Sequence, residues 1–467
     1  MPVSSKQIRD PVYGFIHVPE EFIKIIDHPL FQRLRWISQM GLAQMVFPGA
    51  VHTRFEHCLG TFHLAGIAAS SLIDFCKSFD GSSYLKESKV GQEFLNILKY
   101  DEEAFIKAAC AVALLHDVGH APFSHTFEIA IEDYDHEQFG FKIAAIILED
   151  TECMSQTWAK WALEVLNKQK PVKELEPQNM VLRSLIDGPI DVDKGDYLVR
   201  DSYHCGVQYG GYGQDRLWRN LAILTSDIEG TEILQLGVTS KGAYEAYHLL
   251  MARFHMYEAV YEHHTKQKID AVVAAMLRQI KSFIYSPEML RNFDKQNLNK
   301  DLNKWTDGYI IFGLLTFPTS PFLKSLMQKL YARQLPQKSK KLSEITIPCH
   351  REKVKEISSQ LKKKIWSLQE EMEVDLFPYL YRPQDPFPLR SLYSVSVFSE
   401  DGQVSSLYDF LKLNMLFPAL EEVRDPDKLR SQELLVLRAF SYSDDFSSDT
   451  IQKWQDLGQI ALIEPEL

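Results

Sequence analysis

The chain has 467 residues, of which 45% are hydrophobic, and it carries a formal net charge of −12 at pH 7. A chain of this length can bury a large core and predicts one big domain with an appendage, or two to three units. The acidic balance argues against a protein that coats DNA or RNA, because binding along a phosphate backbone needs a broad positive surface. An anionic substrate would instead need a local basic pocket.

Cysteine usage and the N-terminal composition bear on the compartment. The six cysteines form no C-x-x-C pair, which favours reduced thiols in a cytosol-like setting. Residues 1–10 lack the apolar core of a signal peptide, and no apolar stretch approaches the ~20 residues that span a bilayer. We expect a soluble, cytoplasmic protein without a membrane partner.

Apolar residues recur at spacings of three and four through the first 285 residues, which predicts helices. The expected helices lie near residues 22–30, 62–79, 105–115, 139–148 and 244–283. Polar or Gly/Pro-marked stretches at 80–83, 168–177 and 210–213 predict breaks between them. Strand signals are few, and residues 232–238, followed by Ser240-Lys241-Gly242, form the best candidate for a short hairpin.

The pattern of apolar residues changes in the last third of the chain. Residues 285–348 predict short helices with a Lys-rich connector at 337–341, and one apolar stripe over 354–372 predicts an amphipathic helix. A hairpin is expected from 392–398 and 404–407 around Asp401-Gly402. We therefore expect a mainly α protein with a helical core at 1–285, a helical extension at 286–382 and a small α+β region at 383–467.

The pair His116-Asp117 ends the apolar run 108–115. Neighbouring side chains on a helix point about 100° apart, so this pair needs ligands from other segments to enclose a cation. His57 upstream and the acidic segment 191–197 downstream can supply them. Imidazole and carboxylate ligands suit Mn, Fe, Co, Ni or Zn better than Ca, and they leave positions for water. Such a metal can activate water or clamp phosphate oxygens.

Three histidines, His116, His120 and His125, fall within ten residues. For any one of them alone, a structural role is the commoner one, but the cluster favours a site. Glu128 and His136 lie close by in the chain. A carboxylate that binds a histidine fixes its tautomer and raises its basicity, which proton transfer requires.

Helical spacing groups further polar residues. Arg54 and His57 are three apart and share a face, so the arginine could hold a phosphate beside the metal. Asp193 shares a face with Asp196 and Tyr197, and Lys194 shares one with Asp201. Tyr257, Tyr261 and His264, spaced four and three, predict a polar aromatic stripe on one helix face, although such a stripe is more often core packing.

Ordered motifs along most of the chain carry a family resemblance. They lie at residues 10–14, 31–35, 39–41, 47–50, 54–57, 116–125, 191–201 and 252–261. With them the chain resembles the HD-domain phosphohydrolases, in the branch of the SAM-and-HD-domain dNTP triphosphohydrolases and their bacterial relatives, but without a SAM domain. The resemblance implies an HD-domain helical bundle as the core.

The resemblance also implies a reaction, in which water attacks the α-phosphorus of a deoxynucleoside triphosphate and releases deoxynucleoside and triphosphate. It implies a divalent metal, with Mn, Fe, Zn, Mg, Ni and Co left open. The implied metal ligands are His57, His116, Asp117 and Asp193. His136, oriented by Glu128, would protonate the leaving 5′-oxygen. The implied phosphate ligands are Arg54, His120, His125, Lys194 and Arg253, and the implied sugar pocket comprises Gln39, Met40, Tyr197, Asp201 and Tyr261.

Two features depart from the closest pattern or extend it. Tyr257 and His264 stand where the SAM-and-HD relative has a His and a Lys, so its base and triphosphate preference does not carry over. Asp27, Gln32 and Arg35 match positions of an activating guanine-nucleotide site, which suggests a regulatory nucleotide and a homo-oligomer.

Two other functions compete with a dNTP triphosphohydrolase. One is another phosphohydrolase of the same fold, acting on a nucleoside monophosphate, a signalling nucleotide or single-stranded nucleic acid; the acidic balance weighs against the last. The other is a nucleotide-sensing module without turnover. Retention of the four metal-type residues together with His136 favours an enzyme.

Overall fold

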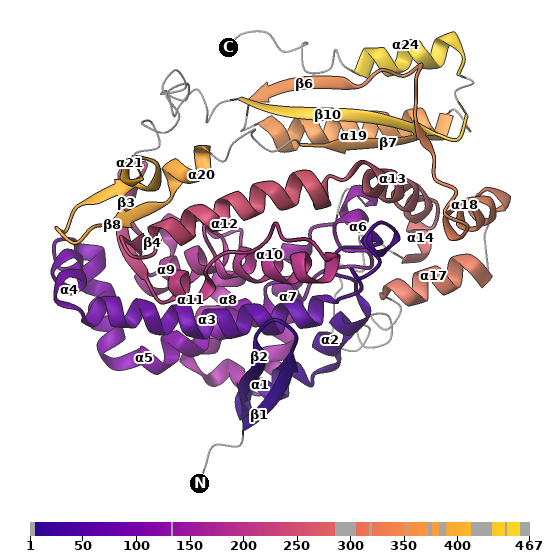
Figure 1. The fold of residues 1–467 in the computed structure, drawn as a ribbon. Coiled ribbons are helices and arrows are strands. Elements are labelled where there is room, and N and C mark those ends of the chain that lie inside the picture. The colour runs from indigo at the N-terminus through magenta and orange to yellow at the C-terminus, as the bar shows by residue number, and fades with distance from the viewer. Residues whose placement is uncertain are drawn as a thin grey trace.

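The structure is a computed structural model, and it describes residues 5–457 apart from 132–133, 285–304, 317–319, 351–352, 372–375, 383–388, 412–431 and 444–445. Two long helices, α3 (Arg54–Lys77) and α5 (Lys89–Leu115), pack against each other and form the centre of the helical body (Figure 1). Around them pack α8 (Thr157–Leu166), α9 (Pro177–Ile186) and α10 (Val192–Cys205), and α12 (Ala243–Met256) packs on α10. The mainly helical fold expected from the sequence is confirmed.

Local signals at the helix ends explain where these helices begin and end. The Ser88 side chain caps α5 by accepting a hydrogen bond from the backbone N–H of Gly91. The side chain of Asp191 does the same for α10 through the N–H of Lys194. Gly206 ends α10 with a left-handed backbone (φ 69°), which glycine adopts without a steric penalty. The α5 helix ends at Leu115, so His116 and Asp117 leave the core directly after its apolar run.

Shorter elements complete the body. They are the hairpin β1 (Ser5–Asp10) and β2 (Gly14–Pro19), and the helices α1 (Glu20–Ile26), α2 (Pro29–Gln32), α4 (Phe79–Leu85), α6 (His125–Ala130), α7 (His136–Asp150), α11 (Gln214–Trp218), α13 (His264–Gln279) and α14 (Lys281–Ile284). Two expectations are wrong in detail. Residues 80–83, expected to be a break, belong to α4. The expected helix 244–283 is divided by the π-helical segment η5 (Tyr257–Tyr261).

A small sheet borders the helical body. Strands β3 (Leu221–Ile228) and β4 (Thr231–Thr239) pair antiparallel and turn at Glu229-Gly230, where both residues have positive φ, so the turn precedes β4 instead of following it at 240–242. The expected later hairpin is present as β8 (Ser396–Phe398) and β9 (Val404–Ser406). Its strands are shorter than expected, because residues 392–394 belong to a helix and Leu407 begins another. Because β8 pairs parallel with β4, this hairpin extends the sheet of the body.

A second layer with its own apolar core lies over one side of the body (Figure 1). Strand β10 (Gln432–Ser441) pairs with β6 (Ile345–His350) and β7 (Leu376–Tyr381), and it also pairs with the short β5 (Gln337–Lys338). The expected amphipathic helix is confirmed as α19 (Val354–Glu371). Further helices among the described residues of this region are α17 (Asp307–Thr316), α18 (Pro321–Tyr331), α20 (Leu389–Ser394), α21 (Leu407–Phe410) and α24 (Ser448–Leu457). Strands thus occur within 286–382, which was expected to be helical.

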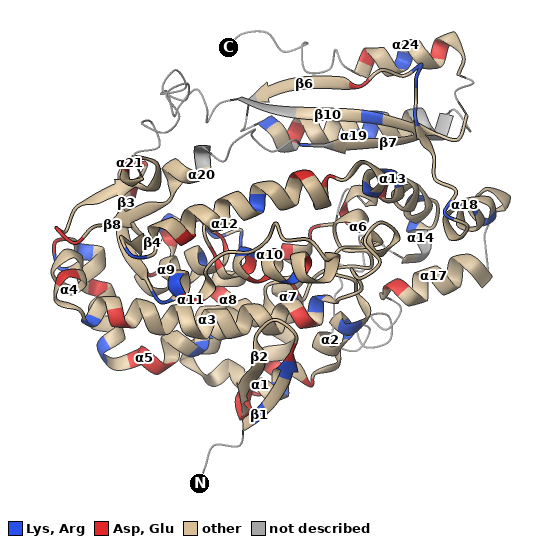
Figure 2. Cartoon of the chain, viewed as in Figure 1, with Lys and Arg blue, Asp and Glu red and all other residues tan. Residues whose placement is uncertain are grey.

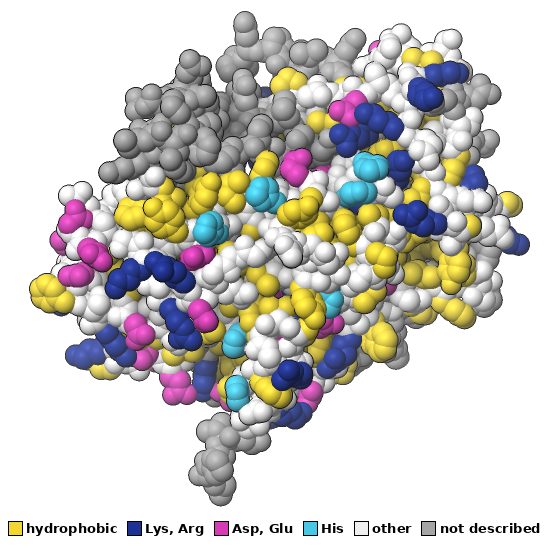
Figure 3. All heavy atoms as spheres, viewed as in Figure 1, with side chains coloured by type: hydrophobic (Ala, Val, Ile, Leu, Met, Phe, Trp, Pro, Cys, Tyr) yellow, Lys and Arg dark blue, Asp and Glu magenta, His cyan; other side chains and the backbone are white. Residues whose placement is uncertain are grey.

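Helix α3 is by length and composition apolar enough to cross a membrane, which the sequence reading did not anticipate. However, 72% of its apolar window is buried inside the fold, as in the central helix of a globular core. Basic and acidic residues are interspersed along the helices of the body (Figure 2). Several basic side chains lie toward the end of the molecule that carries α13 and α18 (Figure 3).

Candidate active site

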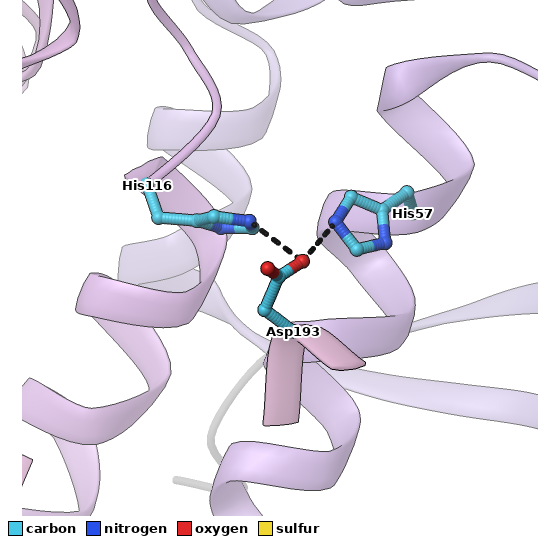
Figure 4. A group of neighbouring side chains, drawn as sticks. All are labelled: His57, His116 and Asp193. Carbon is cyan, nitrogen blue, oxygen red and sulfur yellow. Dashed lines mark ion pairs between the residues drawn. The ribbon is translucent and has the colours of Figure 1, made fainter. Parts of the chain in front are cut away.

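Three helix ends bring four metal-type residues together. His57 lies in the first turn of α3, His116 and Asp117 follow α5, and Asp193 lies in the first turn of α10. His57 and His116 point from opposite sides at the carboxylate of Asp193, with Nε2–Oδ1 distances of 3.0 and 3.5 Å (Figure 4). The carboxylate of Asp117 lies 3.5 Å from Nε2 of His57 and 3.3 Å from Nε2 of His116. The structure thus assembles the four residues predicted as ligands.

The protonation pattern of the two histidines fits a divalent metal. Nδ1 of His57 is hydrogen-bonded to the carboxylate of Asp196 (2.8 Å), and Nδ1 of His116 is hydrogen-bonded to the carbonyl oxygen of Ala113 (2.8 Å). Both Nε2 atoms are buried without a hydrogen bond, and both face carboxylate oxygens. Two nitrogen lone pairs and two carboxylates around one point form a donor set for a cation. Burial lowers the pKa of His57, but Asp193 and Asp196 raise it, to about 10.

A buried ion network behind His57 fixes the orientation of its ring. Asp196 receives Nδ1 of His57 on one oxygen and is bound by Nε and Nη2 of Arg200, both at 2.9 Å. Arg200 also donates Nη1 to Asp10 of strand β1, at 2.9 Å. A Cβ atom at Gly60 would lie 1.8 Å from Oδ1 of Asp196, so only glycine leaves room for this network. The spacing of three between Asp193 and Asp196 predicts a shared helix face, but no role for Asp196 was predicted from the sequence.

Arg54 lies at the edge of the metal group. Its side chain is 4% exposed, pairs through Nη1 with Oδ2 of Asp117, and donates Nε to the hydroxyl oxygen of Ser124 at 3.0 Å. Burial raises the pKa of Asp117, but Arg54 and the neighbouring histidines lower it well below its usual range. Arg54 therefore balances the charge of a ligand in this structure, and it also lies where a phosphate oxygen would approach that ligand.

The other histidines form a proton-transfer cluster next to this group. The ring of His120 stacks on that of His136 at 4.0 Å, and Nε2 of His120 lies 3.3 Å from Asp117. The carboxylate of Glu128 binds Nδ1 of His136 and, at 2.8 Å, Nδ1 of the exposed His125. Burial lowers the pKa of His136, but Glu128 raises it above the ordinary value. Burial, Arg54 and His136 together lower the pKa of His120 well below its ordinary value. His136 is thus suited to hold a proton beside a neutral His120.

Two basic residues line the same region from α10 and α12. Lys194 binds Asp191 at 2.5 Å, and despite burial the aspartates raise its pKa. The guanidinium of Arg253 lies 4.9 Å from the centre of the Tyr257 ring. Lys194 and Asp201 both lie in α10, seven positions apart, and they take different partners: Lys194 binds Asp191, and Asp201 accepts from Tyr261.

Two of the residues predicted for the sugar pocket, Asp201 and Tyr261, are in direct contact. This carboxylate accepts a hydrogen bond from Tyr261 Oη at 2.8 Å and lies 2.7 Å from Nε2 of the fully buried His52, which the sequence reading missed. The rings of Tyr197 and Tyr261 are 6.0 Å apart. Gln39 and Met40 are nearly buried, and Oε1 of Gln39 has no hydrogen-bond partner.

The expected aromatic stripe is only partly formed. Tyr257 and Tyr261 both lie in η5, with ring centres 5.1 Å apart, while His264 begins the separate helix α13. A π-helical turn inserts an extra residue per turn and frequently occurs at functional sites. The stripe on a single helix was therefore a wrong expectation, because the sequence spacing assumed a continuous α-helix.

Comparison with known proteins identifies the class. The HD domain model matches residues 54–187, and the HD associated region model matches residues 223–374. The fold resembles the crystal structure of a phosphohydrolase from Bacteroides thetaiotaomicron with a TM-score of 0.64 at 24% identity, covering 94% of this chain and 100% of that one. The chain therefore contains an HD domain followed by an HD associated region, and it shares its fold with that phosphohydrolase.

Several curated proteins are similar over part of their length. A Methanocaldococcus jannaschii protein is 34% identical over 290 residues, covering 62% of this chain and 53% of its own. The deoxynucleoside triphosphate triphosphohydrolase SAMHD1 homolog of Dictyostelium discoideum is 29% identical, covering 62% and 52%, and human SAMHD1 is 28% identical, covering 57% and 43%. The chain thus spans about half the length of these relatives and has SAMHD1-type homologues at moderate identity.

Proposed function

We propose that this chain is a metal-dependent dNTP triphosphohydrolase, converting a deoxynucleoside triphosphate and water to deoxynucleoside and triphosphate. The observation that carries the proposal is the pair of buried, unbonded Nε2 atoms of His57 and His116, which face Asp117 and Asp193. The named activity of the SAMHD1 relatives supports the choice of substrate.

The metal would be held by His57, His116, Asp117 and Asp193. When bound, a divalent ion supplies Lewis-acid activation of the phosphate and of the attacking water. The chain's own residues perform the remaining tasks. His136, whose Nδ1 is held by Glu128, donates its proton to the leaving 5′-oxygen.

Charge and shape in the pocket support a triphosphate of a deoxynucleoside. Arg54, Lys194 and Arg253 place three cations around an acidic metal group, and several cations are what a triphosphate requires. Asp201 and Tyr261, joined at 2.8 Å, offer an acceptor and a ring for the sugar. We include Gln39, Met40, Tyr197 and Tyr257 in this pocket, and His120 and His125 among the groups that contact phosphate.

The test uses the purified chain, stripped of metal with a chelator and then given one divalent metal at a time. Each of the dNTPs and NTPs is incubated with it, and the products are separated by ion exchange. We expect inorganic triphosphate and deoxynucleoside as products. Turnover should be lost in Asp117→Ala and should remain at the wild-type level in the exposed control Asp215→Ala. Release of pyrophosphate or monophosphate contradicts the proposed reaction, and absence of turnover in every protein favours a nucleotide-sensing module.

We also propose a regulatory nucleotide and a homo-oligomer, in line with the SAMHD1-type relatives. The residues that match the activating site make contacts in the N-terminal part of the chain. The Nε–H of Arg35 donates to Gln32 at 2.7 Å, and Asp27 pairs with Lys6 at 3.0 Å. Light scattering with and without GTP and dNTPs tests this, and an unchanged size contradicts it.

A further inference from the structure

The active-site loop contains two consecutive non-glycine residues with positive φ. Phe123 has φ 62°, and Ser124 has φ 53° with ψ −127°, a conformation that glycine favours. Ser124 is also the residue before α6, which carries His125 and Glu128. The backbone of this turn therefore sets the direction in which the proton-transfer cluster projects. Such residues persist only where the surroundings hold them.

One carboxylate holds this turn to the segment that carries Gln39. Asp307, the first residue of α17, accepts a hydrogen bond from the backbone N–H of Phe123 at 2.8 Å on one oxygen. Its other oxygen accepts from the backbone N–H of Ser38 at 2.9 Å. The hydroxyl of Ser124 closes the arrangement, because it donates to the carbonyl oxygen of Ser38 at 2.7 Å and accepts from Nε of Arg54. Asp307, the turn and Arg54 thus form one connected set.

The chain around Asp307 is itself anchored. Trp305 is 3% exposed and packs its ring against those of Phe127 and Phe139. Its carbonyl oxygen accepts from Nη1 of Arg33 at 3.3 Å, and Arg33 also donates to the carbonyl oxygens of His120 and Val118 at 2.8 Å. A buried cation therefore holds two carbonyl oxygens of the active-site loop, while Asp307 holds the amide of Phe123.

We propose that Asp307 is a positioning residue for the active site: it fastens the strained Phe123–Ser124 turn to the Ser38–Gln39 segment and thereby sets Arg54 and α6 before a substrate binds. Its effect on turnover rests on the proposed function, but its effect on the loop does not. Asp307 lies outside the metal group and outside the residues that would contact the substrate.

The ionised carboxylate is the form that makes both bonds. Burial raises the pKa of Asp307 to about 6, against the opposite influence of its two backbone hydrogen bonds and of Arg54 and Arg33. Among the described residues, the charged groups that act on it are those two arginines, from α3 and η1 (Arg33–Trp36). Above pH 6 both oxygens accept, and below pH 6 the protonated carboxyl presents a donor to an N–H group, so one of the two bonds is lost.

Hydrogen–deuterium exchange of the metal-loaded, substrate-free protein at pH 7.5 tests the inference. The variant is Asp307→Asn, whose amide keeps one acceptor, and the control is Asp215→Asn, an 89% exposed carboxylate. We expect exchange in peptides covering 36–42 and 119–126 to rise about tenfold in Asp307→Asn and to stay at the wild-type rate in the control. The metal content should stay unchanged, while kcat falls about tenfold and the acid limb near pH 6 is lost.

Unchanged exchange in both segments of Asp307→Asn overturns the inference. If that variant does not fold, the wild-type protein at pH 5 and pH 7.5 replaces it, with exchange corrected for the intrinsic rate; equal protection at both pH values then overturns the inference. Faster exchange in a protein that hydrolyses no nucleotide in any form supports the positioning role and contradicts the proposed function, so the two failures are distinguishable.

Discussion

Replacing Asp196 by asparagine is expected to weaken metal binding and to destabilise the protein together. Asp196 receives His57 Nδ1 at 2.8 Å and two donors of Arg200 at 2.9 Å, and all three side chains are fully buried. An asparagine of the same size has one acceptor oxygen, so either His57 or Arg200 faces an amide N–H instead. The change removes a charge while leaving the other buried charges in place.

The magnitude follows from the two interactions lost. Breaking a buried ion pair by removing one partner costs about 3–5 kcal/mol. Because Arg200 keeps its bond to Asp10, we expect the free energy of unfolding to fall by an amount near the lower end of this range, about 3 kcal/mol. Removing the group that orients a metal-binding histidine lowers metal affinity by about 10–100-fold. Both effects are expected at neutral pH, because Asp196, whose pKa is about 2, is ionised there.

Two measurements check this prediction on the same protein. Urea unfolding of the metal-free chain gives the stability difference, and competition with a chelator of known affinity gives the metal dissociation constant. Asp215→Asn is the control, since its carboxylate is 89% exposed. A metal affinity of Asp196→Asn within twofold of wild type, in a protein that remains folded, would refute the reasoning that this network orients His57.

Three other perturbations are expected to have clear outcomes. Gly60→Ala places a Cβ 1.8 Å from Asp196 and should lower the melting temperature and metal affinity as Asp196→Asn does, which thermal unfolding and chelator competition check. Glu128 raises the pKa of His136, so activity that needs the protonated ring should fall at pH values above that raised pKa. In Glu128→Gln the alkaline limb of the kcat profile should move to lower pH. An alkaline limb at the wild-type position contradicts this role of Glu128. Trp454→Ala, in the C-terminal core, should cost about 3–5 kcal/mol in urea unfolding without changing kcat at low temperature; a loss under ~1 kcal/mol would contradict its role in that core.

Some errors in the sequence reading have a local physical cause. The turn of the β3–β4 hairpin lies at Glu229-Gly230, but a single Gly after a polar residue is a weaker signal than the Ser240-Lys241-Gly242 cluster that follows β4. The π-helical turn at Tyr257–Tyr261 keeps the composition of an α-helix, so residue spacing does not reveal it. Strands β6 and β7 are short and pair with β10, which lies far along the chain. Because no neighbouring segment signals this pairing, the sequence around β6 and β7 was wrongly predicted to be helical.

Local sequence by itself determined the helical character of this protein and the chemistry of its site. Helical periodicity is a property of a few consecutive positions, and it indicated α19, most of α3 and the C-terminal part of α5, with the pair His116-Asp117 at a helix end. The ordered motifs then indicated which distant residues join that pair.

Only the tertiary structure decided how those residues are held. Asp307 binds the backbone of residues 269 and 184 positions away, and Arg200 reaches Asp10 across 190 positions. No periodicity links such positions, because these bonds depend on which helix ends and loops meet after the core has packed. The supporting residues Asp196, His52, Ser124 and Asp307 therefore emerge from the fold, while the residue types able to bind a metal could be found along the chain.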